Sequence, residues 1–485
     1  MKPLSAICIL WALSACVGLR TDADLVRRPN VVVLYTDDQG YGDCSALNPA
    51  SGFRTPHMDR LAREGMVFTD GHSAGSVCTP SRYALLTGTY AWRLPSGGGV
   101  LGADTDGLIA DDQPTVASFL KERGYATGIV GKWHLGLQVP GQKGERDWSA
   151  RITDGPLQKG FDHYYGIPAS MNFGVLTWFD GDRAIEPASL WTRKKFPEAE
   201  ISTKPLDYRM APPYDVERQA EGDIEVAPSF RDEDVLRTIA ERSVAFIEEH
   251  ADEPFFLYVA LTSPHLPHCT APEFRGTSGM GNYGDFMVET DHRVGQVLEA
   301  LDRAGVADHT LVLLTSDNGP ENNYRDWERI YGHRSAGVFR GGKRDVYEGG
   351  HRVPFIVRWP GVAEPGTRCD QTVSQTGLLG TLADWFAVNP SGDALMDSLS
   401  FLDCLRGEVA PPHPLVHQGR GRFAIRDGKW KLHFTPNGRE VGEPSELYDL
   451  SSDPGETRNL LGAHPEVVDE LASWADSIVR GLVSQ

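Results

Sequence analysis

The stretch Asn30-Val31-Val32-Val33-Leu34-Tyr35-Thr36-Asp37-Asp38 decides the fold of this chain. Residues 30–36 form a continuous β-branched and apolar run without polar alternation, which is typical of a strand buried on both faces of a parallel sheet. Two carboxylates, Asp37 and Asp38, follow directly. We therefore expect a buried central strand whose carboxyl end carries acidic side chains.

Strand and helix patterns alternate along most of the chain. Strands that alternate with helices indicate an α/β fold, in which a mostly parallel central sheet is sandwiched between helices. Further buried strands are predicted over residues 125–130, 255–261 and 311–315, and helices over 56–64, 115–123, 232–250 and 286–304.

The pattern changes near residue 410. Residues 421–434 alternate like a half-exposed hairpin with Asp427-Gly428 as its turn, and residues 447–450 could pair with it. A closing helix is predicted over residues 465–479. We expect a large domain over 28–408 and a small antiparallel α+β subdomain over 409–485.

The first 16 residues resemble an export signal. Lys2 supplies a positive start, and the apolar core at 7–13 is too short to cross a bilayer as a mature helix. The stretch Leu13-Ser14-Ala15-Cys16 resembles the lipobox of bacterial lipoproteins. We expect an exported protein, periplasmic or at the cell surface, lipid-anchored through Cys16. A plain secretory signal cleaved near Ala15 is the alternative.

The net charge limits the classes of binding partner, and the number of cysteines limits the possible disulfides. The formal net charge of −20 argues against a nucleic-acid binder, which needs a basic face. It also means that an anionic substrate must be attracted by local cations or a metal. Outside the leader the number of cysteines is odd, so at least one is unpaired, and zero to two disulfides are possible. These cysteines are Cys44, Cys78, Cys269, Cys369 and Cys404.

Polar residues follow the predicted strands where each strand ends. In open α/β sheets, functional sites form at the carboxyl ends of the strands. The residues in these positions are Asp37 and Asp38, Lys132 and His134, His265, and Asp317 and Asn318.

Cys78 begins the run Cys78-Thr79-Pro80-Ser81-Arg82, which precedes a short helix closed by Gly88. Backbone N–H groups and the helix dipole favour an anion at a helix N-terminus, so Cys78 is a candidate low-pKa thiolate and nucleophile. A buried structural cysteine is the alternative.

This run, followed by Leu86-Thr87-Gly88, resembles the C-x-P-S-R…L-T-G signature of type I sulfatases in the alkaline-phosphatase superfamily. Within this family, the sequence most resembles members similar to arylsulfatase A and N-acetylgalactosamine-6-sulfatase. The resemblance implies an alkaline-phosphatase-like fold and a sulfuric ester hydrolase. In that family the cysteine is oxidised to formylglycine (3-oxoalanine) by a formylglycine-generating maturase. One hydroxyl of the hydrated aldehyde attacks sulfur, and the other then expels sulfate.

The resemblance also implies roles for individual residues. Arg82, Lys132 and Lys343 would bind sulfate oxygens, His134 would assist sulfate expulsion, and His265 would protonate the departing alcohol. With Cys78 these residues complete the expected catalytic set. One Ca²⁺ ion would be held by oxygen ligands, which suit a hard cation: Asp37, Asp38, the modified Cys78, Asp317 and Asn318.

Two alternatives share these motifs: a phosphoester or phosphonate hydrolase of the same superfamily, and a non-catalytic relative that binds sulfated glycans. The complete set of cations and histidines favours sulfate hydrolysis. We expect a sulfated carbohydrate as substrate, with a hexose or hexosamine sulfate favoured over an aryl sulfate, attacked from the chain end. We expect no nucleic-acid partner and no membrane contact beyond a lipid anchor.

Overall fold

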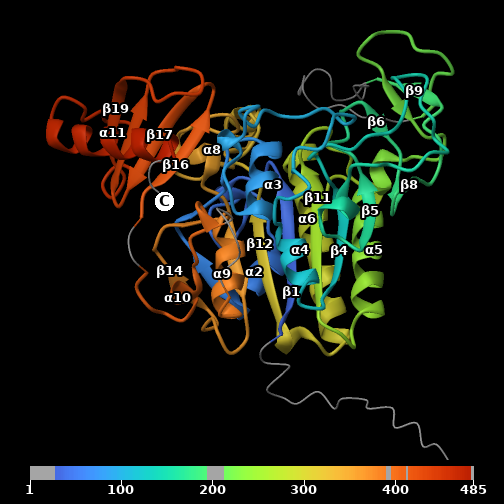
Figure 1. Ribbon diagram of the computed structural model, residues 1–485, viewed down its shortest axis with the longest axis horizontal. Coiled ribbons are helices and arrows are strands. Elements are labelled where there is room, and N and C mark those ends of the chain that lie inside the picture. The colour runs from blue at the N-terminus through green and yellow to red at the C-terminus, as the bar shows by residue number, and fades with distance from the viewer. Residues whose placement is uncertain (1–27, 194–211, 389–394, 411–412, 482–485) are drawn as a thin grey trace, which may run out of the picture.

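The computed structural model describes residues 28–193, 212–388, 395–410 and 413–481 (Figure 1). The leader at 1–16, with Cys16, lies outside the described residues, so export and lipid anchoring stay predictions. Within the described ranges, no helix combines the length and apolarity needed to cross a membrane. The cysteines there are buried and form no disulfide: Cys44, Cys78, Cys269, Cys369 and Cys404.

A ten-stranded sheet forms the centre of the molecule. Its middle strands run parallel, and they contain all four strands predicted from buried apolar runs. The mostly parallel α/β fold is therefore confirmed. In sheet order the parallel strands are β12 (Thr310–Ser316), β1 (Asn30–Asp37), β11 (Phe255–Pro264), β4 (Ala126–Lys132) and β5 (His163–Ile167).

Short strands extend the sheet beyond the parallel core at both ends, mostly by antiparallel pairing. Sequence periodicity did not indicate them, because strands of two to four residues are too short to show alternation. They are β13 (Phe355–Arg358), β2 (Met66–Phe68) and β14 (Thr367–Cys369) on one side, and β7 (Phe179–Asp180) and β8 (Arg183–Ala184) on the other.

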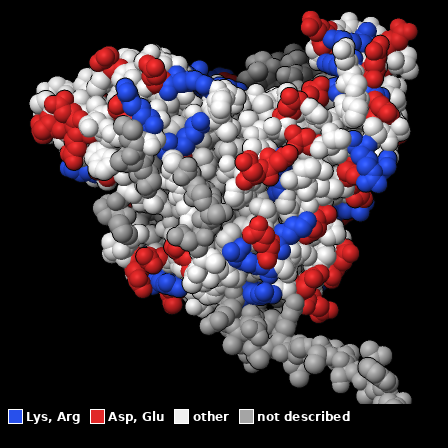
Figure 2. All heavy atoms as spheres, viewed as in Figure 1, with Lys and Arg blue, Asp and Glu red and all other residues white. Residues whose placement is uncertain are grey.

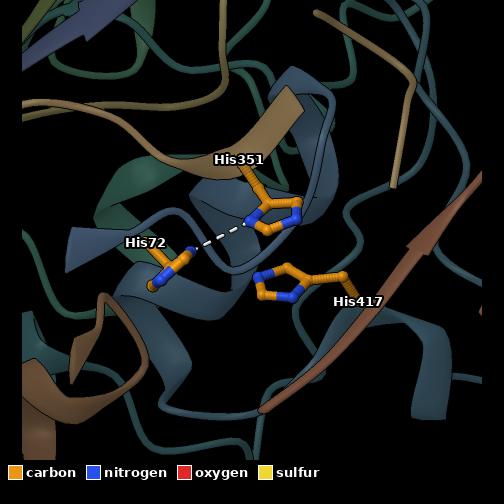
Figure 3. Close-up of side chains that lie close together, drawn as sticks. All are labelled: His72, His351 and His417. Atoms are coloured by element: carbon orange, nitrogen blue, oxygen red, sulfur yellow. Dashed lines mark hydrogen bonds between the residues drawn. The ribbon is translucent and has the colours of Figure 1, made fainter. Parts of the chain in front are cut away.

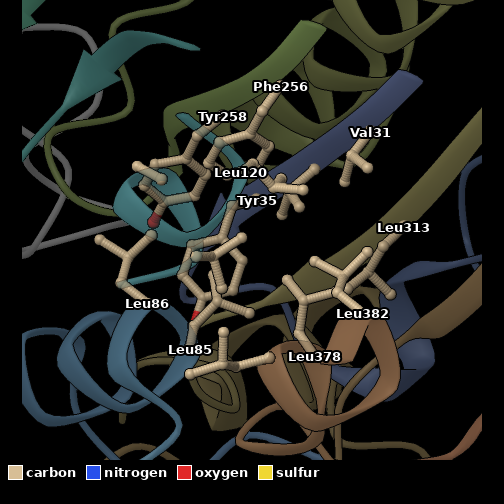
Figure 4. Packing of buried hydrophobic residues seen from close by; sticks show 14 of the residues in the cluster. Val31, Tyr35, Leu85, Leu86, Leu120, Phe256, Tyr258, Leu313, Leu378 and Leu382 are labelled. Carbon is tan, nitrogen blue, oxygen red and sulfur yellow. The ribbon is translucent and has the colours of Figure 1, made fainter. Parts of the chain in front are cut away.

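Successive side chains of β1 enter two different cores, because side chains alternate between the faces of a strand. Val31, Val33 and Tyr35 share one core with α3 (Cys78–Thr87), α4 (Val116–Lys121) and α9 (Gly377–Trp385), part of which Figure 4 shows. Val32 and Leu34 share the other with α2 (Pro56–Glu64), α5 (Val235–Glu249) and α6 (Gly281–Arg303). Since both faces are covered, the strand ends are the places left for polar side chains.

Smaller elements surround this sandwich. One small sheet contains β6 (Val175–Leu176), β10 (Ile224–Val226) and β9 (Leu190–Thr192), and another pairs β3 (Gly71–His72) with β15 (Val373–Ser374). Three short helices lie in the second half of the chain: α7 (Tyr324–Tyr331), α8 (Glu348–His351) and α10 (Leu402–Leu405).

The C-terminal residues form the expected antiparallel sheet with a closing helix, at the red end of Figure 1. Asp427 pairs with Trp430, so the turn of the predicted hairpin lies at Gly428 and Lys429. A strand before the hairpin was not predicted. The elements are β16 (Leu415–Gly419), β17 (Arg422–Asp427), β18 (Trp430–Phe434), β19 (Pro444–Asp449) and α11 (Pro465–Val479).

Buried charged and imidazole side chains join this sheet to the large domain. His72 on β3, His351 on α8 and His417 on β16 lie together (Figure 3), with 3.0 Å between the Nδ1 atoms of His72 and His351. The rings of His351 and His417 stack at 3.6 Å. Ion pairs surround them: Arg426–Asp70, Arg426–Glu348, Lys431–Glu348 and Lys431–Glu456.

These histidines predict a pH-dependent junction. Burial lowers the pKa of His72, His351 and His417 below the usual 6.5, so the unfolded chain takes up protons there and the folded chain does not. We expect the free energy of unfolding to fall as pH drops below 6.5, by about 1.4 kcal/mol per pH unit for each histidine involved. Urea unfolding at a series of pH values measures this slope.

His417→Gln, which cannot take up a proton, should have a shallower slope than the wild-type protein. His309→Gln, at an exposed position, serves as the matched control and should keep the wild-type slope. Equal slopes in all three proteins would contradict a role for the junction.

Candidate active site

The predicted site residues meet at the carboxyl edge of the parallel sheet. Because β1, β4, β11 and β12 run parallel, their ends lie next to one another, as expected. The structure places Asp37 at the end of β1, Lys132 at the end of β4, His265 directly after β11, and Asp317 directly after β12. Cys78 is the first residue of α3, and Lys343 comes from the loop before α8.

The acidic residues form one buried group. Asp37, Asp38, Cys78 and His265 each place a potential ligand atom within 4.8 Å of the others. Asp317 Oδ1 accepts from the backbone N–H of Asp38 at 3.0 Å.

Asn318 completes the group. Its Nδ2 donates to Asp38 Oδ1 at 2.8 Å, whereas its Oδ1 is buried without a hydrogen-bond partner among the described residues. An unpaired amide oxygen beside carboxylates is the kind of donor that a hard divalent cation binds. The residues present therefore fit the predicted metal site.

Three buried ion pairs connect the predicted cations to these acids: Lys132 Nζ–Asp37 Oδ2 at 2.6 Å, Lys343 Nζ–Asp38 Oδ1 at 2.7 Å and Arg82 Nη2–Asp317 Oδ2 at 2.9 Å. Burial by itself would raise the pKa of Asp37, but Lys132, His265 and Arg82 outweigh it and lower this pKa to about 2. Asp37 is therefore an anion throughout the physiological pH range.

Arg82 faces the acids rather than open space. Its Nε and Nη2 atoms both donate to Asp317, at 3.2 and 2.9 Å, and Nη1 donates to the Lys132 carbonyl at 3.3 Å. The side chain is fully buried. In this arrangement the guanidinium positions a carboxylate, and its predicted contact with sulfate stays a prediction.

The thiol of Cys78 is not an activated nucleophile. Cys78 is 2 % exposed, and Sγ lies 3.5 Å from Asp37 Oδ1 as a donor. Burial raises the pKa of Cys78 to about 12, even though Lys132 and Lys343 act to lower it. The low-pKa thiolate suggested by the helix N-terminus is therefore wrong, because removal from water outweighs the local positive charges.

His134 has one free ring nitrogen. Nε2 lies 3.0 Å from the carbonyl oxygen of Leu101, which can only accept, so Nε2 carries the proton. Nδ1 is buried and has no partner in the part of the chain that the structure describes. Burial, Lys132 and Arg82 hold the pKa of His134 well below 6.5, so the ring is neutral with an available lone pair. Thr79 donates to the His134 carbonyl at 3.0 Å, which ties this segment to the Cys78 loop.

His265 presents its other ring nitrogen to the site. Nδ1 donates to the Leu266 carbonyl at 2.6 Å, and Nε2 lies 3.7 Å from Asp38 Oδ2. Burial and Lys343 lower its pKa. Its predicted role as the acid for the leaving alcohol needs a proton on Nε2, the atom that faces the acidic group.

The backbone around the site is strained. Asp38, His134 and Arg344 have φ values of 68°, 59° and 77°, in the left-handed region that costs energy for residues other than glycine. Such strain persists only where surrounding contacts hold it, and it is common at active sites.

Sequence reasoning missed two groups of neighbours. Glu321 and Arg344 form a two-pronged ion pair beside Lys343, with N–O distances of 2.5 and 3.0 Å. Ser170 follows β5, next to Pro168, whose carbonyl accepts from the His134 N–H at 2.8 Å; the Ser170 hydroxyl is buried without a partner among the described residues. The only available signal for Arg344 was its position after Lys343, and Ser170 lay in a loop without a motif.

Comparison with known proteins agrees with this geometry. The family model described as "Sulfatase" matches residues 29–388. This chain belongs to the sulfatase family. A second family model, described as the C-terminal part of N-sulphoglucosamine sulphohydrolase, matches residues 337–476 of this sulfatase and so includes the C-terminal sheet.

Named relatives resemble this sulfatase over nearly their whole length. An N-acetylgalactosamine-6-O-sulfatase of Bacteroides thetaiotaomicron is 34 % identical, over 93 % of this chain and 93 % of the relative. Human arylsulfatase A is also 34 % identical, over 94 % of this chain and 89 % of the relative.

Solved structures show the same fold. A Bacteroides thetaiotaomicron 6S-sulfatase from a study of glycosaminoglycan metabolism has a TM-score of 0.80 at 32 % identity, covering 94 % of this chain and all of the other. A phosphonate monoester hydrolase of Agrobacterium radiobacter has a TM-score of 0.60 at 18 % identity, over 94 % of this chain and 96 % of the other, which shows the shared fold alone. The sulfatase class and the alkaline-phosphatase-like fold are therefore established.

Proposed function

We propose that this sulfatase removes sulfate from a sulfated carbohydrate, using a formylglycine made from Cys78 and one bound calcium ion. The observation that carries the proposal is the place of Cys78, whose buried Sγ lies 3.5 Å from Asp37 Oδ1, beside the ion pairs of Lys132 with Asp37 and of Lys343 with Asp38. A protonated thiol is a poor nucleophile there, whereas the hydrated aldehyde would offer two hydroxyl groups on one carbon.

Calcium is the proposed metal. Asp37, Asp38, Asp317 and Asn318 supply oxygen donors, and the orphaned Asn318 Oδ1 is one of them. When bound, the ion would supply positive charge next to the sulfate oxygens. The oxygen of a modified residue 78 would join the ligands, as the family resemblance implies.

The histidines and lysines divide the remaining tasks. Lys132 and Lys343 would hold sulfate oxygens and balance charge that develops during transfer. His134 Nδ1, the free lone pair, would accept a proton from a hydroxyl at residue 78. His265 would pass a proton from Nε2 to the departing sugar oxygen.

The proposed substrate rests on the names of the relatives, and the proposed location rests on the sequence of the leader. One relative is named for N-acetylgalactosamine-6-O-sulfate, one solved structure comes from a study of glycosaminoglycan metabolism, and another relative is named arylsulfatase A. We propose a hexosamine sulfate as the substrate, with the sulfate removed from a sugar at the chain end. We propose export and lipid anchoring through Cys16. Modification of Cys78 requires a separate maturase.

Chelation tests the metal. Removing divalent cations with EDTA should abolish sulfate release and lower the Tm, and added Ca²⁺ should restore both. A ligand at 100 times its Kd stabilises a protein by about 2.7 kcal/mol. Asn318→Ala should lose most of this calcium-dependent shift, whereas Asn322→Ala, at an exposed position of the following loop, should keep it. A Tm that changes with neither EDTA nor added Ca²⁺ would contradict the proposed calcium site.

Mass spectrometry and kinetics test the proposed activity together. In protein made with a maturase, the Cys78 peptide should be about 18 Da lighter than its cysteine form, whereas ordinary thiol oxidation adds mass. The modified protein should then have a higher kcat/KM for sulfated monosaccharides than for phosphate or phosphonate esters. A clear phosphate preference would favour the alternative hydrolase, and a modified protein without turnover would favour a glycan-binding relative.

A further inference from the structure

Arg344 is fixed next to the reacting residues and faces outward. Its N–H donates to the carbonyl of Ser76, two residues before Cys78, at 2.7 Å. Glu321 has the largest effect on the pKa of Arg344 and raises it, and Asp38 and Cys78 raise this pKa further. Its side chain is nevertheless 42 % exposed. Arg344 therefore lies between the buried site and solvent.

The C-terminal sheet supplies a second arginine at the same place. The turn between β16 and β17 has φ values of 48° at Arg420 and 73° at Gly421, the pattern of a type I′ turn. Arg420 Nε donates to Asp345 Oδ1 at 2.8 Å, and its side chain is 50 % exposed. Its two terminal nitrogens have no partner within the described ranges.

Because Gly419 has no side chain, this turn can pack closely against the backbone of Arg344 and against Ser76. A Cβ atom at Gly419 would lie 2.6 Å from the Arg344 carbonyl oxygen and 2.8 Å from Ser76 Oγ. The backbone of the turn therefore packs directly on the residues that precede Cys78 and follow Lys343. The position of Arg420 is set by the same contacts that set the catalytic loops.

Exposed arginines lie at this place although the protein as a whole is acidic. Arg344 and Arg420 are both at least 42 % exposed, so their guanidinium groups can meet an anion from solvent. Arg344 pairs with Glu321 and Arg420 pairs with Asp345, which leaves the two terminal nitrogens of Arg420 as donors without a partner among the described residues. The chain as a whole carries −20, and on the face in Figure 2 acidic side chains gather at the end formed by α11. Local cations of this kind attract anions that the overall charge repels.

We propose that Arg344 and Arg420 bind a second anionic group of the substrate, on the sugar next to the one that carries the scissile sulfate. The group is a carboxylate or a second sulfate, since guanidinium binds both through paired N–H donors. This inference rests on the proposed sulfated-carbohydrate substrate. It gives the C-terminal sheet a direct part in substrate selection.

Kinetics with matched disaccharides test the inference. Each substrate carries one scissile sulfate, and the neighbouring sugar is neutral, carries a carboxylate or carries a second sulfate. The measured quantity is the ratio of kcat/KM for each disaccharide to kcat/KM for a small aryl sulfate. Arg420→Gly suits the left-handed turn and should fold, and it should lower this ratio about tenfold for the anionic neighbours, mainly through KM.

Three comparisons decide the outcome. Arg420→Lys should recover part of the ratio, and Lys429→Met should leave it at the wild-type value. Lys429 is a matched control, since it lies in the other hairpin turn, is 51 % exposed and pairs with Asp449 at 2.9 Å. The carboxylate and sulfate arms show which anion is preferred. An unchanged ratio in Arg420→Gly would overturn the inference. The ion pair between Arg420 and Asp345 would then only stabilise the turn.

The proposed function can fail separately. If the modified wild-type protein hydrolyses no sulfate ester, the Kd values of the same disaccharides are measured by calorimetry. Weaker binding of only the anionic ones to Arg420→Gly would still support the subsite, and equal binding would overturn it.

Discussion

Cys78→Ser is expected to lower kcat/KM for a sulfate ester by at least about four orders of magnitude, since loss of a covalent nucleophile has effects of this size. A serine hydroxyl that stays unoxidised at this position can attack once, but it lacks the second hydroxyl of an aldehyde hydrate that expels sulfate. Steady-state kinetics of maturase-treated protein measure the effect. The Tm should change little, because the two side chains are similar in size.

Cys44→Ser is the matched control, because Cys44 is also a fully buried free thiol in the same domain. It should retain kcat/KM within a few-fold of the wild-type protein. Activity of Cys78→Ser within tenfold of wild type, in protein whose residue 78 mass spectrometry shows to be unoxidised serine, would show that no modified residue is needed and would contradict the proposed mechanism.

The second large effect is on stability. Arg82→Met should lower the free energy of unfolding by about 3–5 kcal/mol, because it leaves the buried carboxylates of Asp317 and Asp37 without their guanidinium partner. Calcium would offset part of this repulsion, so the loss should be larger after chelation. Urea unfolding with and without EDTA measures both values, and kcat/KM should fall as well.

Arg60→Met provides the comparison at the surface. Arg60 pairs with Glu64 at 2.6 Å, but the two side chains are 28 % and 38 % exposed, and such pairs contribute about 1 kcal/mol or less. If Arg82→Met and Arg60→Met lower the free energy of unfolding by the same small amount, the Arg82 guanidinium does not stabilise the Asp37 and Asp317 carboxylates in the way that the distances indicate.

The long regular elements could be predicted from sequence because their patterns are unambiguous. The run at 30–36 has no polar interruption, and the helix at Pro56–Glu64 begins with proline and stops before glycine. The short strands outside the parallel core could not be predicted. Strands such as Met66–Phe68 are too short to show alternation, and their pairing depends on partners hundreds of residues away.

The site was predictable in part for the same reason. Residues such as Asp37 and Asp317 follow strong strand signals, so their convergence followed from parallel topology. The pKa of Cys78 was not predictable, because it depends on complete burial in the folded chain. The packing of Gly419 against Ser76 joins two distant turns, and no local pattern of residue types indicates it.

The central position of β1 has a consequence for how the protein folds. Asn30, at its start, bonds to residues 225 and 280 positions further along the chain. Pairings of such high contact order close very long loops before they gain stabilising contacts, so folding is expected to be slow. During that time the apolar strand sequences remain exposed and prone to aggregation. Yields of active protein should therefore depend on synthesis rate and temperature, and a fragment that ends before β12 should have no catalytic centre.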